Sequence, residues 1–591
     1  MKQFLTTMAG VFAGLVLFLV GVPFLLIVMA AGAAKPAPTP SHAVLELDLR
    51  DPLTDQDPVN PFASIGRRSM SVMSVIETLE RARKDGKVKA VLVRLPEGGM
   101  TPASADEIRL ALKKFRAAGK AVYAHSQGLY PSGMVASTYM LGSAADEFWM
   151  QPGASLQVTG VASEDLFLKR FFDKYGVKAD YEQRYEFKNA VNPYLYSDYT
   201  PAHREAQLSW MGSIYGATLL NAAGDRKQQP QALRASLEGG PYQAEDALKL
   251  KLIDKVGQVK DAETAILAKA GKGAELVEFE KYMRASRERV PRPGPAIAVV
   301  EGEGAIMTGR DGTANPFSSS SAMYSDDISE ALYDAIEDKD VKAIVFRVSS
   351  PGGSDTASEQ ILAAVRAAKA AKKPVVVSMG GYAASGGYWI SSEASAIVAQ
   401  PTTLTGSIGV FGGKFVLGPA LERFGVDVRQ LNVGGDYAGA FGTGSEMNQA
   451  QRAAFAGWMD RIYDNFVARV AEGRKLPAER VREIAKGRVW TGVQARELGL
   501  VDEVGGFYQA VDKAKALAGL SGEVRLKRMT TQVSPFQALE SAFGVSATSI
   551  RTLAAAAWLM GDPRAQGVLD QMAQERLRSS GATVLAPTPV K

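Results

Sequence analysis

The sequence contains no cysteine and only three histidines. Without cysteine, the chain cannot form disulfides, thiolate metal sites or a cysteine nucleophile. The scarcity of histidine also disfavours a histidine-rich metal cluster. A Ser-His-Asp triad would have to use His42, His125 or His203, and only His125, at the end of a predicted strand, is well placed for chemistry. Because a single histidine is more often structural, we expect a different catalytic base.

Long runs of one charge are absent as well. The 591 residues carry 68 basic and 63 acidic side chains, which gives a net charge of +5. The two signs are interspersed without a basic block, so nothing indicates nucleic-acid binding. The length is enough for roughly three to four domain-sized units.

Charged side chains are missing from residue 3 to residue 34. The apolar core from Val11 to Ala31 has about the 20 residues that a membrane-spanning helix requires. A cleaved signal peptide has a shorter apolar core of about 7–15 residues, so we expect residues 1–34 to be a retained anchor, although the small residues at 30–34 leave cleavage open. Lys2 predicts a cytoplasmic N-terminus. The proline-rich residues 35–44 form the predicted linker.

The chain repeats itself after about 250 residues. Val88-Lys-Ala-Val-Leu-Val-Arg94 resembles Val341-Lys-Ala-Ile-Val-Phe-Arg347, and each run is typical of a buried strand. A helical pattern and a second strand follow in both places, which predicts parallel β-α units and an α/β fold. We expect two homologous domains at 45–285 and 295–525, then a C-terminal tail at 526–591.

Each repeat also contains a predicted helix start. Ser104-Ala-Asp-Glu107 and Thr356-Ala-Ser-Glu359 have the spacing of capping boxes, in which a hydroxyl and a carboxylate satisfy free N–H groups. The predicted helices run from 108 to 118 and from 361 to 371.

The second repeat contains a serine among small residues, Gly381-Tyr-Ala-Ala-Ser385-Gly-Gly-Tyr-Trp389. Such packing permits a sharp turn between a strand and a helix, and the helix N-terminus favours developing negative charge. Gly353, after the preceding predicted strand, should lie at the same sheet edge. We therefore interpret Ser385 as a nucleophile, with the N–H groups of Gly353 and Gly386 as oxyanion donors.

The first repeat supplies a candidate base in Tyr185-Glu-Phe-Lys188-Asn-Ala-Val191. Apolar neighbours could desolvate the Lys188 amine and lower its pKa from about 10.4 toward the operating pH. When the repeats are aligned, Ser385 falls on Gly133 and Lys188 falls on Tyr437, so each repeat retains half of a dyad. On its own, however, a serine in a glycine-rich loop is more often a turn residue, and a lone lysine is usually a surface charge.

At these residues the sequence resembles the long, membrane-anchored signal peptide peptidases of peptidase family S49. The matching segments are Ser350-Pro-Gly-Gly353, Tyr382-Ala-Ala-Ser-Gly-Gly-Tyr-Trp389, Leu404-Thr-Gly-Ser-Ile-Gly409 and Lys188-Asn-Ala-Val-Asn-Pro193. The resemblance implies two tandem ClpP/crotonase-like domains, Ser385 as nucleophile and Lys188 as general base. It also implies that Ser407 supports the lysine, and that no metal or organic cofactor is needed.

The resemblance further implies a homotetramer in the bacterial inner membrane, with one membrane span and the catalytic domains in the periplasm. The implied substrates are cleaved signal peptides and other apolar, unfolded peptides. Two other readings of the sequence stay open, a crotonase-type acyl-CoA enzyme and a non-catalytic membrane scaffold.

Overall fold

The computed structural model describes residues 39–57, 70–286, 294–310, 322–529 and 584–585, with the single residues 7, 10 and 14. Apart from those three positions, the predicted anchor lies outside the described residues. In the described part of the chain, no helix is both long enough and apolar enough to cross a bilayer. We use "first half" for residues 43–286 and "second half" for residues 294–529.

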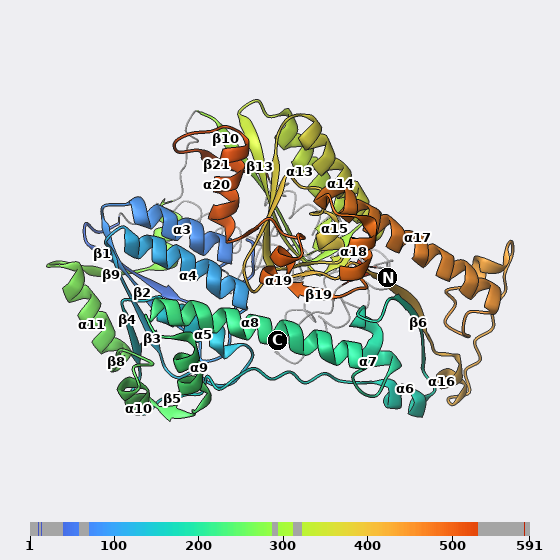
Figure 1. Ribbon diagram of the computed structural model, residues 1–591, viewed down its shortest axis with the longest axis horizontal. Helices are drawn as coiled ribbons and strands as arrows, with labels where there is room; N and C mark the ends of the chain where they lie inside the picture. The colour runs from blue at the N-terminus through green and yellow to red at the C-terminus, as the bar shows by residue number, and fades with distance from the viewer. Residues whose placement is uncertain are drawn as a thin grey trace.

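The first half contains a large parallel sheet with the strand order β8-β4-β3-β2-β1-β9 (Figure 1). β2 covers the predicted strand Val88–Arg94, whose apolar, β-branched residues suit a strand covered on both faces. The other strands are β1 (Ala43–Asp48), β3 (Ala121–Ser126), β4 (Glu147–Met150), β8 (Lys255–Val256) and β9 (Glu275–Glu278).

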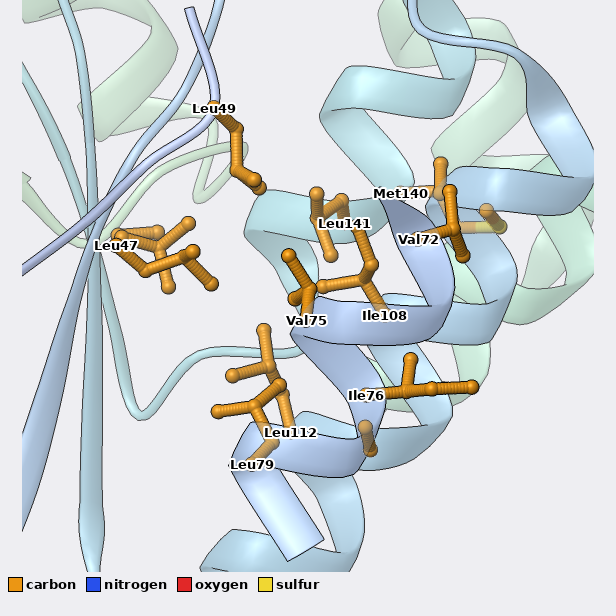
Figure 2. Close-up of a cluster of buried hydrophobic side chains, with 14 of the residues drawn as sticks. Leu47, Leu49, Val72, Val75, Ile76, Leu79, Ile108, Leu112, Met140 and Leu141 are labelled. Carbon is orange, nitrogen blue, oxygen red and sulfur yellow. The ribbon is translucent and has the colours of Figure 1, made fainter. Parts of the chain in front are cut away.

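Helices cover both faces of this sheet. On one face, side chains of α3, α4 and α5 meet Leu47 of β1 in a buried apolar cluster (Figure 2). On the other face, Ala262 and Ile266 of α11 pack against the sheet. The helices are α3 (Val72–Lys84), α4 (Pro102–Ala117), α5 (Val135–Ser143) and α11 (Val259–Ala270), with α12 (Phe279–Ser286) after β9.

The second half contains a sheet in the order β19-β17-β15-β13-β10-β21, with β16 and β20 branching from β15. All its pairings are parallel except β17 with β19. The strands are β10 (Ala296–Glu303), β13 (Val341–Ser350), β15 (Val375–Ala384), β16 (Ala396–Ala399), β17 (Leu404–Gly406), β19 (Val489–Thr491), β20 (Glu503–Val504) and β21 (Arg525–Arg528).

The two halves share one continuous core. Phe507 and Ala510 of α20 (Phe507–Leu517) belong to the same buried cluster as residues of α3 and α4 in the first half. The opposite face of the second sheet has its own buried cluster, to which α13, α14, α17 and α18 contribute. These helices are α13 (Ser325–Glu337), α14 (Asp355–Ala370), α17 (Gln449–Arg474) and α18 (Ala478–Ile484).

The predicted helix starts were wrong by two residues or more. α4 begins at Pro102 after Thr101, and α14 begins at Asp355 after Ser354, whose hydroxyl accepts the Ala357 N–H. Proline suits the first helical position, so it starts α4 earlier than the capping-box pattern indicates. The Glu107 carboxylate accepts hydrogen bonds from Arg347 and from the Phe507 N–H instead of capping its own helix.

A buried arginine joins the halves. Arg347, on β13 and 1% exposed, donates two hydrogen bonds to Asp55 and one to Glu107, both in the first half. The same guanidinium donates to Ser378 Oγ on β15. Breaking a buried ion pair leaves an uncompensated charge in the interior, which costs free energy. The contacts of Arg347 therefore hold the two halves in a fixed relative position.

Part of the first half extends over the second. β6 (Lys178–Arg184) pairs antiparallel with β18 (Val410–Val416), and α8 (Pro201–Asp225) runs from α5 to β19 (Figure 1). The shorter elements are β5 (Ser155–Leu156), α6 (Lys169–Tyr175), η3 (Asn189–Val191), α7 (Asn192–Leu195), α9 (Pro230–Glu238), β7 (Tyr242–Gln243), α10 (Ala244–Lys249), α15 (Gly386–Trp389), α16 (Gly418–Glu422), η4 (Asp436–Gly439) and α19 (Gly492–Glu497).

A small sheet lies at the end of β13. Its order is β12-β11-β14-β22, formed by β12 (Ala322–Tyr324), β11 (Ala305–Met307), β14 (Gly352–Gly353) and β22 (Val584–Leu585). β22 pairs antiparallel with β14, so the described end of the chain lies beside the predicted oxyanion residue Gly353.

Candidate active site

Ser385 occupies the turn between β15 and α15. Its φ of 56° and ψ of −119° are rare for a residue with a side chain, and such conformations concentrate at functional sites. Its N–H donates to the Gly406 carbonyl at 2.8 Å, which holds the turn against β17. The side chain is buried. The geometry resembles the sharp strand-to-helix turns that present a nucleophilic serine.

The glycines after Ser385 are required by packing. A Cβ added at Gly387 would lie 2.6 Å from the Ser350 carbonyl oxygen. One added at Gly386 would lie 3.0 Å from the Gly353 nitrogen. The start of α15 therefore lies against the turn after β13, and a larger residue would separate them.

Lys188 reaches this turn from the first half. It lies between β6 and η3, and its side chain is fully buried. Its Nζ is 2.8 Å from Ser385 Oγ, 2.9 Å from Ser407 Oγ and 3.0 Å from the Ser407 carbonyl oxygen. The structure thus brings together the two residues that the sequence singled out in different repeats.

The environment of Lys188 favours the neutral amine. Burial places its pKa well below the usual 10.5. In the described part of the chain it forms no ion pair that would offset this desolvation. A neutral amine has two N–H donors and one lone pair. The two Ser407 oxygens can accept the donors, which leaves the lone pair for the Ser385 hydroxyl.

Ser407 is held by the backbone rather than by side chains. It follows β17 with a φ of 50°, and its N–H donates to the Arg488 carbonyl at 2.7 Å. This conformation turns both its carbonyl and its hydroxyl toward Lys188.

The predicted oxyanion donors also lie near each other. Gly386 is the first helical residue of α15, so its N–H has no acceptor within the helix. Gly353 lies on β14, opposite Ile306 of β11. A Cβ at Gly353 would lie 2.0 Å from the Ile306 carbonyl oxygen, so only glycine fits there. A substrate carbonyl next to Ser385 could accept from both N–H groups.

Sequence reasoning missed the residues that hold the Lys188 backbone. The Phe187 N–H donates to the Lys486 carbonyl at 3.2 Å. Gly487 lies so close that an added Cβ would be 2.5 Å from Lys188 Cβ. Gly487 and Arg488 belong to no motif, and their only sequence signal is the turn composition of Lys486-Gly-Arg488. Their role depends on a contact between residues about 300 positions apart in the chain.

The histidines lie elsewhere. His125 Nε2 is 3.1 Å from the Gly257 carbonyl, and the His203 ring packs against Phe167 and Tyr199. Burial lowers the pKa of both imidazoles. Among the described residues, no histidine contacts Ser385, and no group of three or more His, Cys, Asp or Glu side chains could hold a metal ion.

Comparison with known proteins identifies the family. The model of peptidase family S49 matches residues 114–273 and 367–521, one region in each half. The chain belongs to peptidase family S49. Both S49 regions lie in the α/β fold described above, and family membership supports a serine protease.

Several curated relatives cover most of the chain. "Protease 4" of Salmonella typhi is 34% identical over 83% of this chain and 81% of its own length. "Protease 4" of Haemophilus influenzae is 32% identical over 86% of this chain and 83% of its own. "Serine protease SPPA, chloroplastic" of Arabidopsis thaliana is 26% identical over 86% and 75%, respectively.

Similarity to solved structures is weaker. A mutant of the "1510-N membrane-bound stomatin-specific protease" in complex with a substrate peptide is 17% identical. It covers 42% of this chain and 97% of its own, with a TM-score of 0.25. A mutant of ClpP1 from Listeria monocytogenes is 14% identical, covers 36% of this chain and 94% of its own, and has a TM-score of 0.21.

Proposed function

We propose that the protein is a membrane-anchored serine endopeptidase with a Ser-Lys dyad, in which Ser385 is the nucleophile and Lys188 the general base. The single observation that carries this proposal is the buried Lys188 amine 2.8 Å from the Ser385 hydroxyl. Membership of family S49 supports the same chemistry. Ser407 orients the amine, and Gly353 and Gly386 donate to the oxyanion.

The reaction proceeds through an acyl-enzyme. Neutral Lys188 accepts the Ser385 proton as Oγ attacks the scissile carbonyl carbon. The carbonyl oxygen becomes an oxyanion and accepts from the two glycine N–H groups. The Lys188 ammonium then protonates the leaving amine as the C–N bond breaks. A water molecule, deprotonated by Lys188, attacks the ester and releases the acid product and Ser385.

The substrate class and cellular setting are part of the proposal. The uncharged run at residues 3–34 supports an anchor in the bacterial inner membrane, with the catalytic domains at 45–285 and 295–525 in the periplasm. The substrates are cleaved signal peptides and other apolar, unfolded peptides, because the anchor keeps the site near lipid. The assembly is a homotetramer, which the mass of the detergent-solubilised particle tests.

Fluorophosphonate labelling and cleavage of an apolar peptide test the dyad directly. We expect wild type to be labelled at Ser385, and Ser385→Ala and Lys188→Ala to lose labelling and cleavage by a factor of about 10³ or more. Because the neutral amine is the active form, the labelling rate should rise with pH through the Lys188 pKa, which lies below 10.5.

Lys414→Met is the matched control. Lys414 is also a buried lysine whose pKa is lowered by desolvation, but its Nζ donates to the Gly442 and Ser445 carbonyls, which lie between η4 and α17, and not to Ser385. Its labelling rate for each folded molecule should stay near wild type. Undiminished labelling of Lys188→Ala would contradict the assignment of the base.

A further inference from the structure

Arg488 contacts aromatic rings from both halves of the molecule. Its guanidinium carbon lies 4.8 Å from the centroid of the Phe187 ring, next to Lys188 in the chain. The same carbon lies 4.5 Å from the ring of Trp490, on β19. A guanidinium stacked on an aromatic face is attractive, and more so when the pair is partly desolvated.

The backbone of Arg488 contacts Ser407, which is a second neighbour of Lys188. Its carbonyl accepts the Ser407 N–H at 2.7 Å, and Ser407 supplies two of the three contacts of Lys188 Nζ. One residue therefore supports Lys188 both through Phe187 and through Ser407. The side chain also forms an ion pair with Glu205 at 2.7 Å, but Glu205 is 60% exposed, so that pair contributes little.

We propose that Arg488 is a positioning residue for the peptidase reaction, whose guanidinium fastens the Phe187-Lys188 segment to β19 and thereby keeps the amine aligned with Ser385 and shielded from water. Arg488 acts through its neighbours and does not touch the reacting atoms. The inference rests on the proposed function, since it assigns a role in aligning that same dyad.

The proposal predicts a change in pH dependence as well as in rate. Burial is what lowers the Lys188 pKa. If Phe187 is released, water reaches the amine, and its pKa rises toward 10.5. More of the base is then protonated at neutral pH. Activity should therefore fall near pH 7 and recover as the pH approaches 10.

The experiment measures the fluorophosphonate labelling rate of Ser385 against pH in the full-length protein. For Arg488→Gln we expect the labelling rate at pH 7 to fall about 10- to 100-fold, as misplacement of a catalytic group typically causes. The rising limb of its pH–rate profile should move to higher pH. Arg488→Lys keeps the charge beside Glu205 but loses the flat stacking surface, so it should show most of the same shift. Phe187→Leu, which leaves Arg488 and its backbone contact in place, should shift the limb in the same direction.

The control is Arg482→Gln, which lies six positions before Arg488 in the chain. It removes an exposed arginine that donates to Asp464 on α17. It should leave both rate and limb unchanged. A loss of the same factor at every pH in Arg488→Gln and Phe187→Leu would reduce Arg488 to a purely structural role and overturn the inference. The inference would also be overturned if both variants had the wild-type labelling rate and the wild-type pH–rate profile. Absence of labelling in wild type itself would instead refute the proposed function.

Discussion

Gly487 allows the Lys188 backbone to approach the second half. It adopts a φ of +80°, and an added Cβ would lie 2.5 Å from Lys188 Cβ and 2.6 Å from its nitrogen. No rearrangement of a flexible side-chain end can relieve this contact, because the atoms it meets belong to the backbone and to Cβ. Glycine is therefore needed both for the backbone conformation and for the approach.

Replacing this glycine should damage the site more than the fold. We expect Gly487→Ala to lower kcat for peptide cleavage by about 100-fold, since Lys188 must move away from Ser385. The matched control is Gly522→Ala, because Gly522 has a similar φ of +76° with nothing within 4 Å of an added Cβ. Gly522→Ala should show only the conformational cost of about 1–2 kcal/mol and full activity. Equal kcat in the two variants would contradict this account of position 487.

Individual residues also show how far the sequence could predict the site. The small residues around Ser385 and the apolar neighbours of Lys188 are local patterns, so both side chains could be singled out from the sequence. Gly487, Arg488 and the pairing of Arg347 with Asp55 depend on contacts between distant segments. No local sequence pattern encodes such contacts, so they could be identified only from the structure.

At the scale of elements, strands were easier to predict than helix ends. β2 has the predicted bounds, and β13 extends the predicted strand to Ser350. The apolar runs fix these strands because both faces are buried. The helix starts were misplaced because an acidic residue in the first turns can serve either a cap or a tertiary contact. Glu107 and Glu359 both serve tertiary contacts, the latter with Trp389.

β22 makes a prediction at the same scale. It pairs with β14, whose edge is where an extended peptide could add a strand next to Gly353. Ending the chain after Thr583 should therefore lower the KM for an apolar peptide by about five-fold, or ~1 kcal/mol for one or two backbone hydrogen bonds, with kcat unchanged.

Ending the chain after Ala586 is the matched control, because it removes residues 587–591 but leaves β22. Steady-state kinetics of the two truncated proteins against full-length protein decide the matter. An unchanged KM in the shorter protein would mean that β22 does not compete with substrate.

For the molecule as a whole, two partly buried carboxyl groups on β10 lie between the halves. Glu303 accepts the N–H groups of Asp55 and Gln56 from the first half, and Glu301 lies 3.4 Å from Arg528. Desolvation is the main cause that raises the pKa of each to about 7, and the charge of Asp55 adds to the effect at Glu303.

These shifts predict how stability depends on pH. Both pKa values are raised above the unfolded value of 4.5, so the folded state holds protons that the unfolded state releases. The stabilisation of the folded state that comes from these two raised pKa values is fully present below about pH 4.5, and it is lost as the pH rises through about 7. For each group the change is at most of the order of 3 kcal/mol.

Thermal unfolding at pH 5.5 and pH 8 measures this effect. Wild type should melt at a lower temperature at pH 8, and Glu301→Gln or Glu303→Gln should reduce the difference. Glu330→Gln, which removes an exposed carboxylate paired with Arg310, should keep the wild-type difference. A pH response that is equal in all four proteins would show that these two groups do not govern it.

The distribution of the dyad over the chain has a consequence for biosynthesis. Lys188 and Ser385 are 197 residues apart, and the segment that fastens Lys188 lies about 100 residues further still. During synthesis, Lys188 is therefore added to the chain well before Ser385, and both are added well before the segment that fastens Lys188. On the proposed roles, a nascent chain cannot hydrolyse peptides before all three segments have been synthesised and have folded together.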